Sequence, residues 1–229
     1  MAIVIPAFNE EINLMVLLPK VMKYCNEFDI IVVNDGSIDG TAQVVERFTK
    51  TNRKIKLLSH PFNIGGGASV QTGVRFALLK GYDYVIQVDA DNQHDPAEVK
   101  KLLEPLLNDE ADLVIGSRFL GKTYFRTSPI RLLGIKFYSK MASILTKQKI
   151  TDVTSGFKAM NRKVLSFVAT NYPSRHPALE ATIKMGREGL RIKEVPVHMR
   201  IRQYGQSEFS IKRFFLFPFR MIISLIKAV

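Results

Sequence analysis

Short apolar runs alternate with amphipathic segments through the first half of the chain. The runs are rich in Ile and Val and carry few polar residues, as expected of strands covered on both faces of a sheet. They occupy residues 3–5, 30–33, 55–58, 84–88 and 112–115. Four β-α alternations in about 110 residues predict an α/β fold with a mostly parallel, doubly wound, Rossmann-like sheet.

Apolar residues spaced three and four positions apart predict helices between these runs and again in the second half of the chain. Asp95 and Pro96 have the residue types of an N-cap and a first helical position, so one helix is expected to begin there. The predicted helices lie at about 9–27, from 41 past 48, 68–78, 96–106, 130–145, 164–169, 179–185 and 211–229, and a last strand lies at 192–197.

The net charge of +12 is concentrated in the second half of the chain. Residues 1–110 contain 11 Lys and Arg against 15 Asp and Glu, whereas residues 111–229 contain 22 against 6. With 46% hydrophobic residues the chain can bury one sizeable core, so the charge step marks a change of role within one compact unit. The basic half is expected to meet an anion: nucleic acid, a membrane surface or a phosphorylated substrate.

The cysteine content and the first residues of the sequence indicate the cellular compartment in which the protein is expected. A single cysteine, Cys25, excludes an internal disulfide and favours a reducing environment. The first apolar run begins at Ile3, so we expect no signal peptide ahead of it.

The apolar run at 84–88 stops at two carboxylates one residue apart, Asp89 and Asp91. If the backbone stays extended, both side chains point to the same side and can bind one divalent cation. With Gln93 they form a set of oxygen donors suited to Mg²⁺ or Mn²⁺ held jointly with substrate phosphates. The alternative is a surface turn in which the carboxylates cap a helix. His94 is interpreted as a structural neighbour rather than a ligand.

Two other features follow predicted strands. Asp35 ends the second run and can either accept a hydrogen bond from a base or ribose or form the turn beside Gly36. The glycines at 65–67 open a predicted helix, but no Gly-Lys-Ser/Thr follows them. They also lack the Gly-x-Gly-x-x-Gly spacing after the first strand, so the sequence argues against a P-loop and a dinucleotide fingerprint.

Eight short motifs occur in a defined order. They are Pro-Ala-Phe-Asn-Glu at 6–10, Asn-Asp-Gly-Ser at 34–37, Asn-x-Gly-x-Gly at 63–67, Asp-Ala-Asp-Asn-Gln-His at 89–94, Gly-Ser-Arg at 116–118, Asp-x-x-Ser-Gly-Phe at 152–157, Glu-Val-Pro-Val at 194–197 and Arg-x-x-Gly-x-Ser at 202–207. The ordered set resembles the family 2 glycosyltransferases with a GT-A fold, in particular the polyprenyl-phosphate sugar synthases such as dolichyl-phosphate mannose synthase. The resemblance covers nearly the whole chain.

The resemblance implies an inverting glycosyltransferase that uses a UDP- or GDP-linked sugar and either Mg²⁺ or Mn²⁺. It assigns the nucleotide-sugar to Pro6, Ala7, Phe8, Glu10, Asp35, Gly65 and Asp89. It assigns the metal to Asp89, Asp91 and Gln93, and the acceptor phosphate to Arg118, Arg131 and Arg202. The residues it implies in catalysis are Asp91, Arg118, Glu180 and Arg202.

Three positions depart from the pattern of that family. Gly66 stands where a lysine is frequent, which removes one candidate phosphate contact. Glu208 replaces a common lysine, and Phe8 replaces a frequent tyrosine, so its aromatic face is kept while the hydroxyl is lost.

The chemistry of the acceptor decides which groups are needed. A phosphate is already an anion at neutral pH, so arginines can orient it without a strong general base. A glycan hydroxyl would require a carboxylate base. Glu180 is the candidate for that base and Asp152 is a second one, although Asp152 is interpreted as a helix cap.

The predicted helices at 130–145 and 211–229 mix Lys and Arg with Leu, Ile and Phe, as amphipathic helices at a membrane interface do. The run 214–229 contains Pro218, Arg220 and Lys227, and it is too short and too charged to span the hydrocarbon core. We therefore expect peripheral, monotopic association with the cytoplasmic face of a membrane. The alternative is that the apolar faces of these helices pack on the sheet.

The expected organisation is a GT-A catalytic domain at 1–210 followed by an amphipathic, membrane-associated helix at 211–229. Within the domain, 1–116 is the nucleotide-sugar-binding half and 117–210 the acceptor-binding half. The expected function is transfer of a sugar to a polyprenyl or dolichyl phosphate at a membrane surface. The identity of the sugar, a membrane-protein partner and a second copy of the chain are left open.

Three alternatives remain beside this function. One is transfer to a glycan hydroxyl in cell-surface polysaccharide synthesis. Another is a pseudo-enzyme that binds the donor without turnover, which the intact pair of Asp89 and Asp91 disfavours. The third is a basic nucleic-acid-binding protein, but the second half is rich in aliphatic residues and lacks interleaved basic and aromatic platforms. We expect no nucleic-acid partner.

Overall fold

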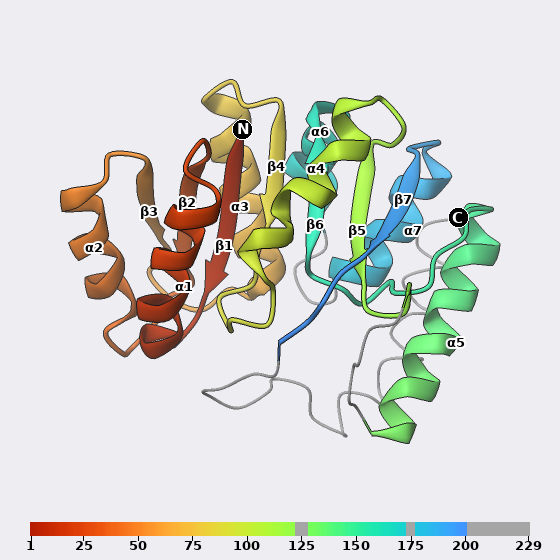
Figure 1. Ribbon diagram of the computed structural model, residues 1–229, viewed down its shortest axis with the longest axis horizontal. Helices are drawn as coiled ribbons and strands as arrows, with labels where there is room; N and C mark the ends of the chain where they lie inside the picture. The colour runs from red at the N-terminus through yellow and green to blue at the C-terminus, as the bar shows by residue number, and fades with distance from the viewer. Residues whose placement is uncertain (122–127, 173–176, 201–229) are drawn as a thin grey trace.

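The strands of the chain form one central sheet (Figure 1). The computed structural model describes residues 1–121, 128–172 and 177–200. Within these ranges the sheet has seven strands, which are β1 (Ala2–Ala7), β2 (Asp29–Asn34), β3 (Ile55–Ser59), β4 (Tyr84–Gln87), β5 (Leu113–Ser117), β6 (Lys158–Asn161) and β7 (Ile192–Pro196). All five strands predicted in the first half of the chain and the one predicted at 192–197 are confirmed, with ends shifted by a few residues.

The order of the strands across the sheet is β3-β2-β1-β4-β6-β5-β7. β1 pairs in parallel with β2 and β4, β2 pairs in parallel with β3, and β5 pairs in parallel with β7. β6 runs antiparallel to both of its neighbours, β4 and β5. The mostly parallel sheet is therefore confirmed, and the carboxyl ends of the six parallel strands share one edge.

The antiparallel strand β6 was not predicted. Its sequence is Lys-Ala-Met-Asn, which is too short and too polar at its ends to stand out as an apolar run. The chain enters β6 at the edge where β4 and β5 finish, and the amide of Gly116 donates to the carbonyl of Phe157 at 2.8 Å. The Ser-Gly-Phe motif is thereby placed between the ends of these two strands.

Helices cover both faces of the sheet (Figure 1). Their bounds are α1 (Glu11–Tyr24), α2 (Thr41–Thr51), α3 (Gly66–Leu79), α4 (Val99–Leu107), α5 (Pro129–Thr146), α6 (Arg162–Asn171) and α7 (Pro177–Arg187), and a 3₁₀ turn, η1 (Pro96–Glu98), precedes α4. Apolar side chains of α1, α2 and α4 form one buried cluster with one face of the sheet, and those of α3, α5, α6 and α7 form the other.

Two predicted helix boundaries differ in detail from those observed. The Asp95 carboxylate accepts a hydrogen bond from the amide of Ala97 at 3.2 Å, so this residue caps η1 rather than the α-helix itself. The first helix ends at Tyr24 and not near Glu27, because the chain must turn to bring Phe28 into the core beside β2.

The helix predicted at 130–145 is confirmed as α5, and its two sides differ. Ser128 caps it by accepting a hydrogen bond from the amide of Arg131 at 3.3 Å. Its inner side packs against the second cluster, whereas four large apolar residues of its outer side are between 60% and 71% exposed: Ile130, Leu133, Phe137 and Ile144. Packing against the second cluster, mainly against α7, thus accounts for only one side of α5. Among the described residues no helix is long and apolar enough to cross a membrane.

One sheet joins the two predicted halves of the catalytic domain, because β6 of the second half lies between β4 and β5. The boundary at 116 falls inside β5 and stays a prediction of function rather than a division of the fold. The helix predicted at 211–229 lies outside the described residues.

Candidate active site

The loops that follow β1 and β2 are fastened to each other. Asn9, with a left-handed φ of 54°, donates its amide to Ser37 Oγ at 3.0 Å and accepts the amide of Ile38 at its Oδ1, also at 3.0 Å. The amide of Glu10 donates to Thr41 Oγ1 at 2.9 Å. These bonds explain the polar residues of the two motifs, which fix the carboxyl ends of neighbouring strands relative to each other.

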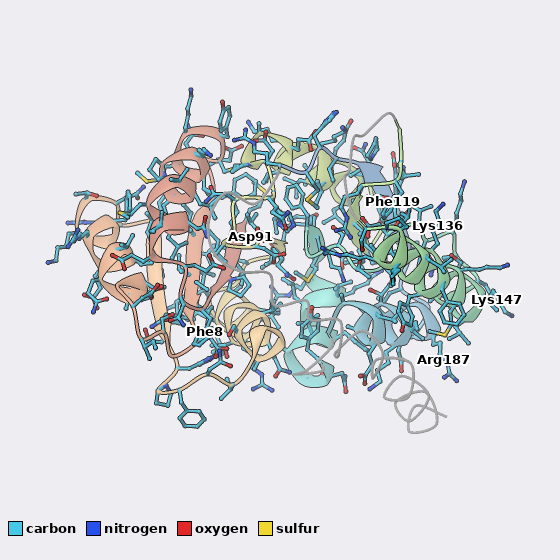
Figure 2. The ribbon with its side chains drawn as sticks, turned by 90° about the horizontal axis from the view of Figure 1, so that it is seen from below. Phe8, Asp91, Phe119, Lys136, Lys147 and Arg187 are labelled. Atoms are coloured by element: carbon cyan, nitrogen blue, oxygen red, sulfur yellow. The ribbon has the colours of Figure 1, made fainter. Side chains whose placement is uncertain are left out.

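The residues assigned to the nucleotide-sugar at 6–10 lie at this edge. Pro6 and Ala7 end β1 opposite Val33 and Asn34 of β2. Phe8 is half-buried, and the Glu10 carboxylate accepts a hydrogen bond from the side-chain amide of Asn13. Figure 2 looks at the molecule from the side where β1 ends, and in this view Asp91 lies between Phe8 and Phe119.

Asp35 is buried, and its carboxylate holds the glycine-rich loop. It accepts hydrogen bonds from the amides of Ile64 at 3.1 Å and Gly65 at 2.8 Å. The ring of His60 lies between Asp35 and Thr72, with Nδ1 2.7 Å from Asp35 Oδ1 and Nε2 3.0 Å from Thr72 Oγ1. Three partners on one buried carboxylate give Asp35 a structural task that the sequence did not indicate.

Gly36 and Gly65 have conformations that side chains rarely adopt. Gly36 has a φ of 67°, and a Cβ there would lie 2.4 Å from the carbonyl carbon of Phe62. Gly65 precedes α3 with a φ of 103°. The loop at 60–67 therefore packs closely on the end of β2, and the first amides of α3 point toward the same edge of the sheet as Asp35.

The acid pair lies directly beyond β4. Asp89 Oδ1 accepts a hydrogen bond from Gln87 Nε2 at 3.2 Å, and Asp91 Oδ1 accepts one from the amide of Gln93 at 3.1 Å. The Asp89 side chain keeps 39% of its surface exposed. A Cβ on Gly156 would come within 2.3 Å of Asp89 Oδ2, so the glycine of the Ser-Gly-Phe motif leaves room for this carboxylate.

His94 is a buried residue that contacts the backbone of the acid pair. It is 3% exposed, and its ring stacks on Phe157 with centroids 4.7 Å apart and an angle of 12° between the planes. Its Nδ1 accepts a hydrogen bond from the amide of Asp89 at 2.9 Å, so the ring proton of this tautomer is on Nε2. Burial and this hydrogen bond make His94 a structural neighbour of the acid pair.

The donor set at this edge fits a divalent cation held together with a substrate. No group of three His, Cys, Asp or Glu side chains that could hold a metal ion occurs among the described residues. The chain thus offers two carboxylates and the side-chain carbonyl of Gln93 instead of a closed cage. Mg²⁺ and Mn²⁺ favour oxygen ligands, and Mg²⁺ in particular is usually bound by one or two carboxylates plus substrate phosphates, so the residues present suit either ion.

Arg118 forms a buried, bidentate ion pair with Asp152. Its Nε lies 2.6 Å from Asp152 Oδ2 and its Nη2 lies 2.6 Å from Asp152 Oδ1, while Nη2 also donates to Thr154 Oγ1 at 2.6 Å. The amide of Arg118 donates to the same carboxylate at 3.0 Å. The interpretation of Asp152 as a helix cap is wrong, since no helix begins there and its carboxylate holds the arginine after β5 in place.

Arg131 lies close to this ion pair. Burial lowers the pKa of Arg131, the neighbouring guanidinium of Arg118 lowers it further, and the carboxylate of Asp152 partly offsets both. Two of the three predicted acceptor-phosphate arginines are therefore brought together. The third, Arg202, lies outside the described residues, but the chain reaches Arg200 beside the metal motif, where its amide donates to the carbonyl of Gln93 at 2.9 Å.

The loop that carries Asp152 is itself held by β7. The Glu194 carboxylate accepts the amide of Asp152 at 2.7 Å, and it also accepts the amide and hydroxyl of Thr151. Burial raises the pKa of Glu194, and the hydrogen bonds from Thr151 and Asp152 partly offset this effect. The Glu-Val-Pro-Val motif thus contributes a carboxylate that shapes the arginine side of the site.

Glu180 is placed on α7, where its carboxylate pairs with Lys184 at 3.0 Å. The ion pair spans one turn of the helix. No hydrogen bond or ion pair joins Glu180 to Asp89, Asp91 or Arg118 in the described part of the chain. Its predicted role near the acceptor stays a prediction.

Sequence reasoning missed Gln87, His60 and Lys158. Gln87 is the polar residue at the end of an apolar strand, and its position two residues before Asp89 is a signal that could have identified it. His60 is remote from Asp35 in the sequence and gave no such signal. Lys158, the one charged residue in the stretch Ser-Gly-Phe-Lys-Ala-Met, is buried beneath the site.

The sheet order, with an acid pair beyond the fourth strand and an antiparallel strand beside it, is that of the GT-A class of glycosyltransferase folds. A glucosyl-3-phosphoglycerate synthase from Mycobacterium tuberculosis has the same fold, with a TM-score of 0.72 and 18% identity over 99% of this chain and 79% of that one. So does a mannosyltransferase from Pyrobaculum calidifontis in complex with GDP-Man and Mn²⁺, with a TM-score of 0.62 and 16% identity over 99% and 62%.

The chain belongs to glycosyl transferase family 2, whose sequence profile matches residues 2–168. It is 30% identical to a polyprenol monophosphomannose synthase of Mycolicibacterium smegmatis over 91% of this chain and 80% of the relative. It is 29% identical to an undecaprenyl-phosphate mannosyltransferase of Micrococcus luteus over 90% and 86%. The resemblance to polyprenyl-phosphate sugar synthases is confirmed, and the protein is a glycosyltransferase.

Proposed function

We propose that this glycosyltransferase moves a sugar from a nucleotide-sugar to a polyprenyl phosphate. The observation that carries the proposal is the placement of two opposite charges around β6. Asp89 follows β4 on one side of that strand, and Arg118 follows β5 on the other. Adjacent strands lie about 4.8 Å apart, so the ends of β4 and β5 lie roughly 10 Å apart, which leaves room between them for a donor diphosphate at the acid pair and an acceptor phosphate at the arginines.

The donor is held at the edge formed by the loops after β1, β2 and β4. Phe8 offers an aromatic face to the nucleotide, and Asp89 and Asp91 with Gln93 would hold Mg²⁺ or Mn²⁺ against the diphosphate. A divalent ion bound there neutralises charge on the leaving diphosphate. Asp35, which keeps the glycine-rich loop in place, would present that loop to the base.

The acceptor is oriented by arginines. Arg118 is fixed by Asp152, so its guanidinium enters the reaction without having to be ordered first, and Arg131 adds a second positive charge. An oxygen of the acceptor phosphate attacks C1 of the sugar and forms the new C–O bond. The bond from C1 to the diphosphate breaks, the nucleoside diphosphate leaves with the electron pair, and C1 is inverted.

This chemistry requires no proton to be removed from the acceptor. A glycan hydroxyl would need a carboxylate base, yet Asp152 is occupied by Arg118 and Glu180 pairs with Lys184. The ion pairs therefore favour phosphate over hydroxyl as the acceptor. Family membership also decides in favour of an enzyme over a nucleic-acid-binding protein.

Several relatives are named for lipid-linked acceptors. They include the polyprenol and undecaprenyl-phosphate enzymes and a UDP-N-acetylglucosamine--dolichyl-phosphate N-acetylglucosaminyltransferase of Methanococcus voltae, 27% identical over 90% of this chain. The test of the proposal is a transfer assay with a panel of UDP- and GDP-sugars, Mn²⁺ and a polyprenyl phosphate. Transfer to the lipid phosphate with release of the nucleoside diphosphate is expected, and no transfer from any donor would contradict it.

We propose further that the enzyme works at a membrane surface through α5. Four exposed apolar residues of this helix lie beside exposed Lys136 and Lys140, a combination typical of a helix at a lipid interface: Ile130, Leu133, Phe137 and Ile144. Figure 2 labels Lys136 on α5 and Lys147 directly after the last residue of that helix.

Replacing both Leu133 and Phe137 with aspartate is expected to weaken binding to vesicles of anionic lipid about tenfold or more. The reason is that two apolar side chains lose their place in the lipid and two negative charges face anionic headgroups. Co-sedimentation with vesicles measures the effect, and Leu79→Asp on α3, at a residue 85% exposed, is the matched control. Equal vesicle binding by the double variant and the control would refute a membrane role of α5.

A further inference from the structure

Lys158 is a buried cation beneath the candidate active site. It occupies the first position of β6 and is 3% exposed. Its Nζ donates to the carbonyl of Ala178 at 3.4 Å and to Thr182 Oγ1 at 3.3 Å, both on α7. These partners are neutral and distant, and Lys158 forms no ion pair within the described ranges. An ammonium in such surroundings carries a large desolvation cost, which calls for an explanation.

The register of the sheet connects Lys158 to the acid pair. Lys158 lies directly opposite Gln87 in the antiparallel ladder of β4 and β6, so the two side chains share one face of the sheet. Gln87 Nε2 donates to Asp89 Oδ1, whereas the buried Gln87 Oε1 has no hydrogen-bond partner among the described residues. The neighbouring ammonium is a donor suited to that oxygen. Gln87 thus stands between the lysine and the first metal-binding carboxylate.

The charge of Lys158 interacts with carboxylates on both sides of the site. Burial lowers the pKa of Lys158 to about 8, and the carboxylates of Asp152 and Asp89 each raise it in partial compensation. Both carboxylates therefore interact with the ammonium through space, and the interaction acts in both directions. A positive charge at this point attracts an anion bound beside these carboxylates and opposes a further cation there.

We propose that Lys158 is a positioning residue that makes the site favour a divalent cation bound together with a nucleoside diphosphate over the cation alone. The ammonium repels a free cation at Asp89 but attracts the negatively charged diphosphate that would share it. Gln87, which lies opposite Lys158 in the sheet, holds the Asp89 carboxylate in place by its own hydrogen bond. This inference rests on the proposed function, because it takes the diphosphate of a nucleotide-sugar as the second ligand.

The test compares Lys158→Met and Lys158→Gln with the wild-type protein by calorimetry. Mn²⁺ is titrated first, and UDP and GDP are then titrated at saturating Mn²⁺. Loss of the charge is expected to tighten the binding of Mn²⁺ alone about tenfold and to weaken the binding of the nucleoside diphosphate about tenfold. Lys158→Gln keeps a hydrogen-bonding group near Gln87 and Thr182 without the charge, so it also serves if the methionine variant does not fold.

Lys56→Met is the matched control, because Lys56 is an exposed strand lysine on β3. This variant is expected to change the dissociation constants of Mn²⁺ and of the nucleoside diphosphate by no more than about twofold. If Lys158 had a purely structural role, its replacement would weaken the binding of Mn²⁺ and of the nucleoside diphosphate together. That result, or no change in either affinity, would overturn the inference. If the wild-type protein bound neither Mn²⁺ nor any nucleoside diphosphate, the proposed function would fail and this inference with it.

Discussion

The Asp91→Asn protein is expected to lose sugar transfer by about a thousandfold, which corresponds to ~4 kcal/mol of transition-state stabilisation. Asparagine keeps the shape of the side chain and can still accept the hydrogen bond that Asp91 Oδ1 receives from the amide of Gln93. What it removes is one negative charge beside the cation and the diphosphate. The loss is measured as kcat/KM with saturating Mn²⁺, alongside the affinity for the nucleotide-sugar.

Asp83→Asn is the control for this experiment. Asp83 directly precedes β4, whereas Asp91 follows it, so Asp83 lies at the opposite edge of the sheet. Its side chain is 66% exposed and pairs with Arg162 at 3.2 Å. Its replacement is expected to leave transfer within about twofold of wild type. Full Mn²⁺-dependent donor binding and turnover in Asp91→Asn would remove the metal assignment from this acid pair.

The Arg118→Lys protein is expected to lose about a hundredfold in kcat/KM for the lipid phosphate while its affinity for the nucleotide-sugar stays within about twofold of wild type. Lysine keeps the positive charge but cannot reproduce the fork that binds both oxygens of Asp152. The charge that orients the acceptor would then be free to move, which costs orientation rather than donor binding.

Arg162→Lys provides the matched comparison, because Arg162 also pairs with an aspartate but does so in solvent, with 56% of its side chain exposed. Exposed ion pairs of this kind contribute little, so that variant is expected to resemble wild type. An equal loss of donor and acceptor affinity in Arg118→Lys would show that Arg118 supports the fold of the site instead of the acceptor. Thermal unfolding of both variants separates lost stability from lost orientation.

Much of the fold could be predicted because the parallel strands are buried on both faces and stand out as apolar runs. β1, β2 and β4 show this directly. β6 could not be predicted in the same way, because it is four residues long and begins with a lysine. Its position between β4 and β5 depends on tertiary pairing that no local pattern contains, and this strand brings the Ser-Gly-Phe motif and Lys158 to the site.

The motifs of the candidate site were visible in the sequence, but several tasks within them were not. The positions of Asp89 and Asp91 follow from the end of β4. Asp35 holds His60 and the loop at 64–65, and Asp152 holds Arg118. These partners are 25 to 34 residues away along the chain, and sequence spacing cannot identify them. Gly156 is also explained only by the space that the Asp89 carboxylate needs.

The acceptor is the central claim, and a single-turnover experiment tests it directly. The protein with Mn²⁺ and one equivalent of radiolabelled nucleotide-sugar is mixed with equal concentrations of a polyprenyl phosphate and a glycan acceptor. The arginines beside β5 and the engaged carboxylates predict that the label appears on the lipid phosphate. Label on the glycan hydroxyl, with the lipid phosphate left unglycosylated, would contradict this account.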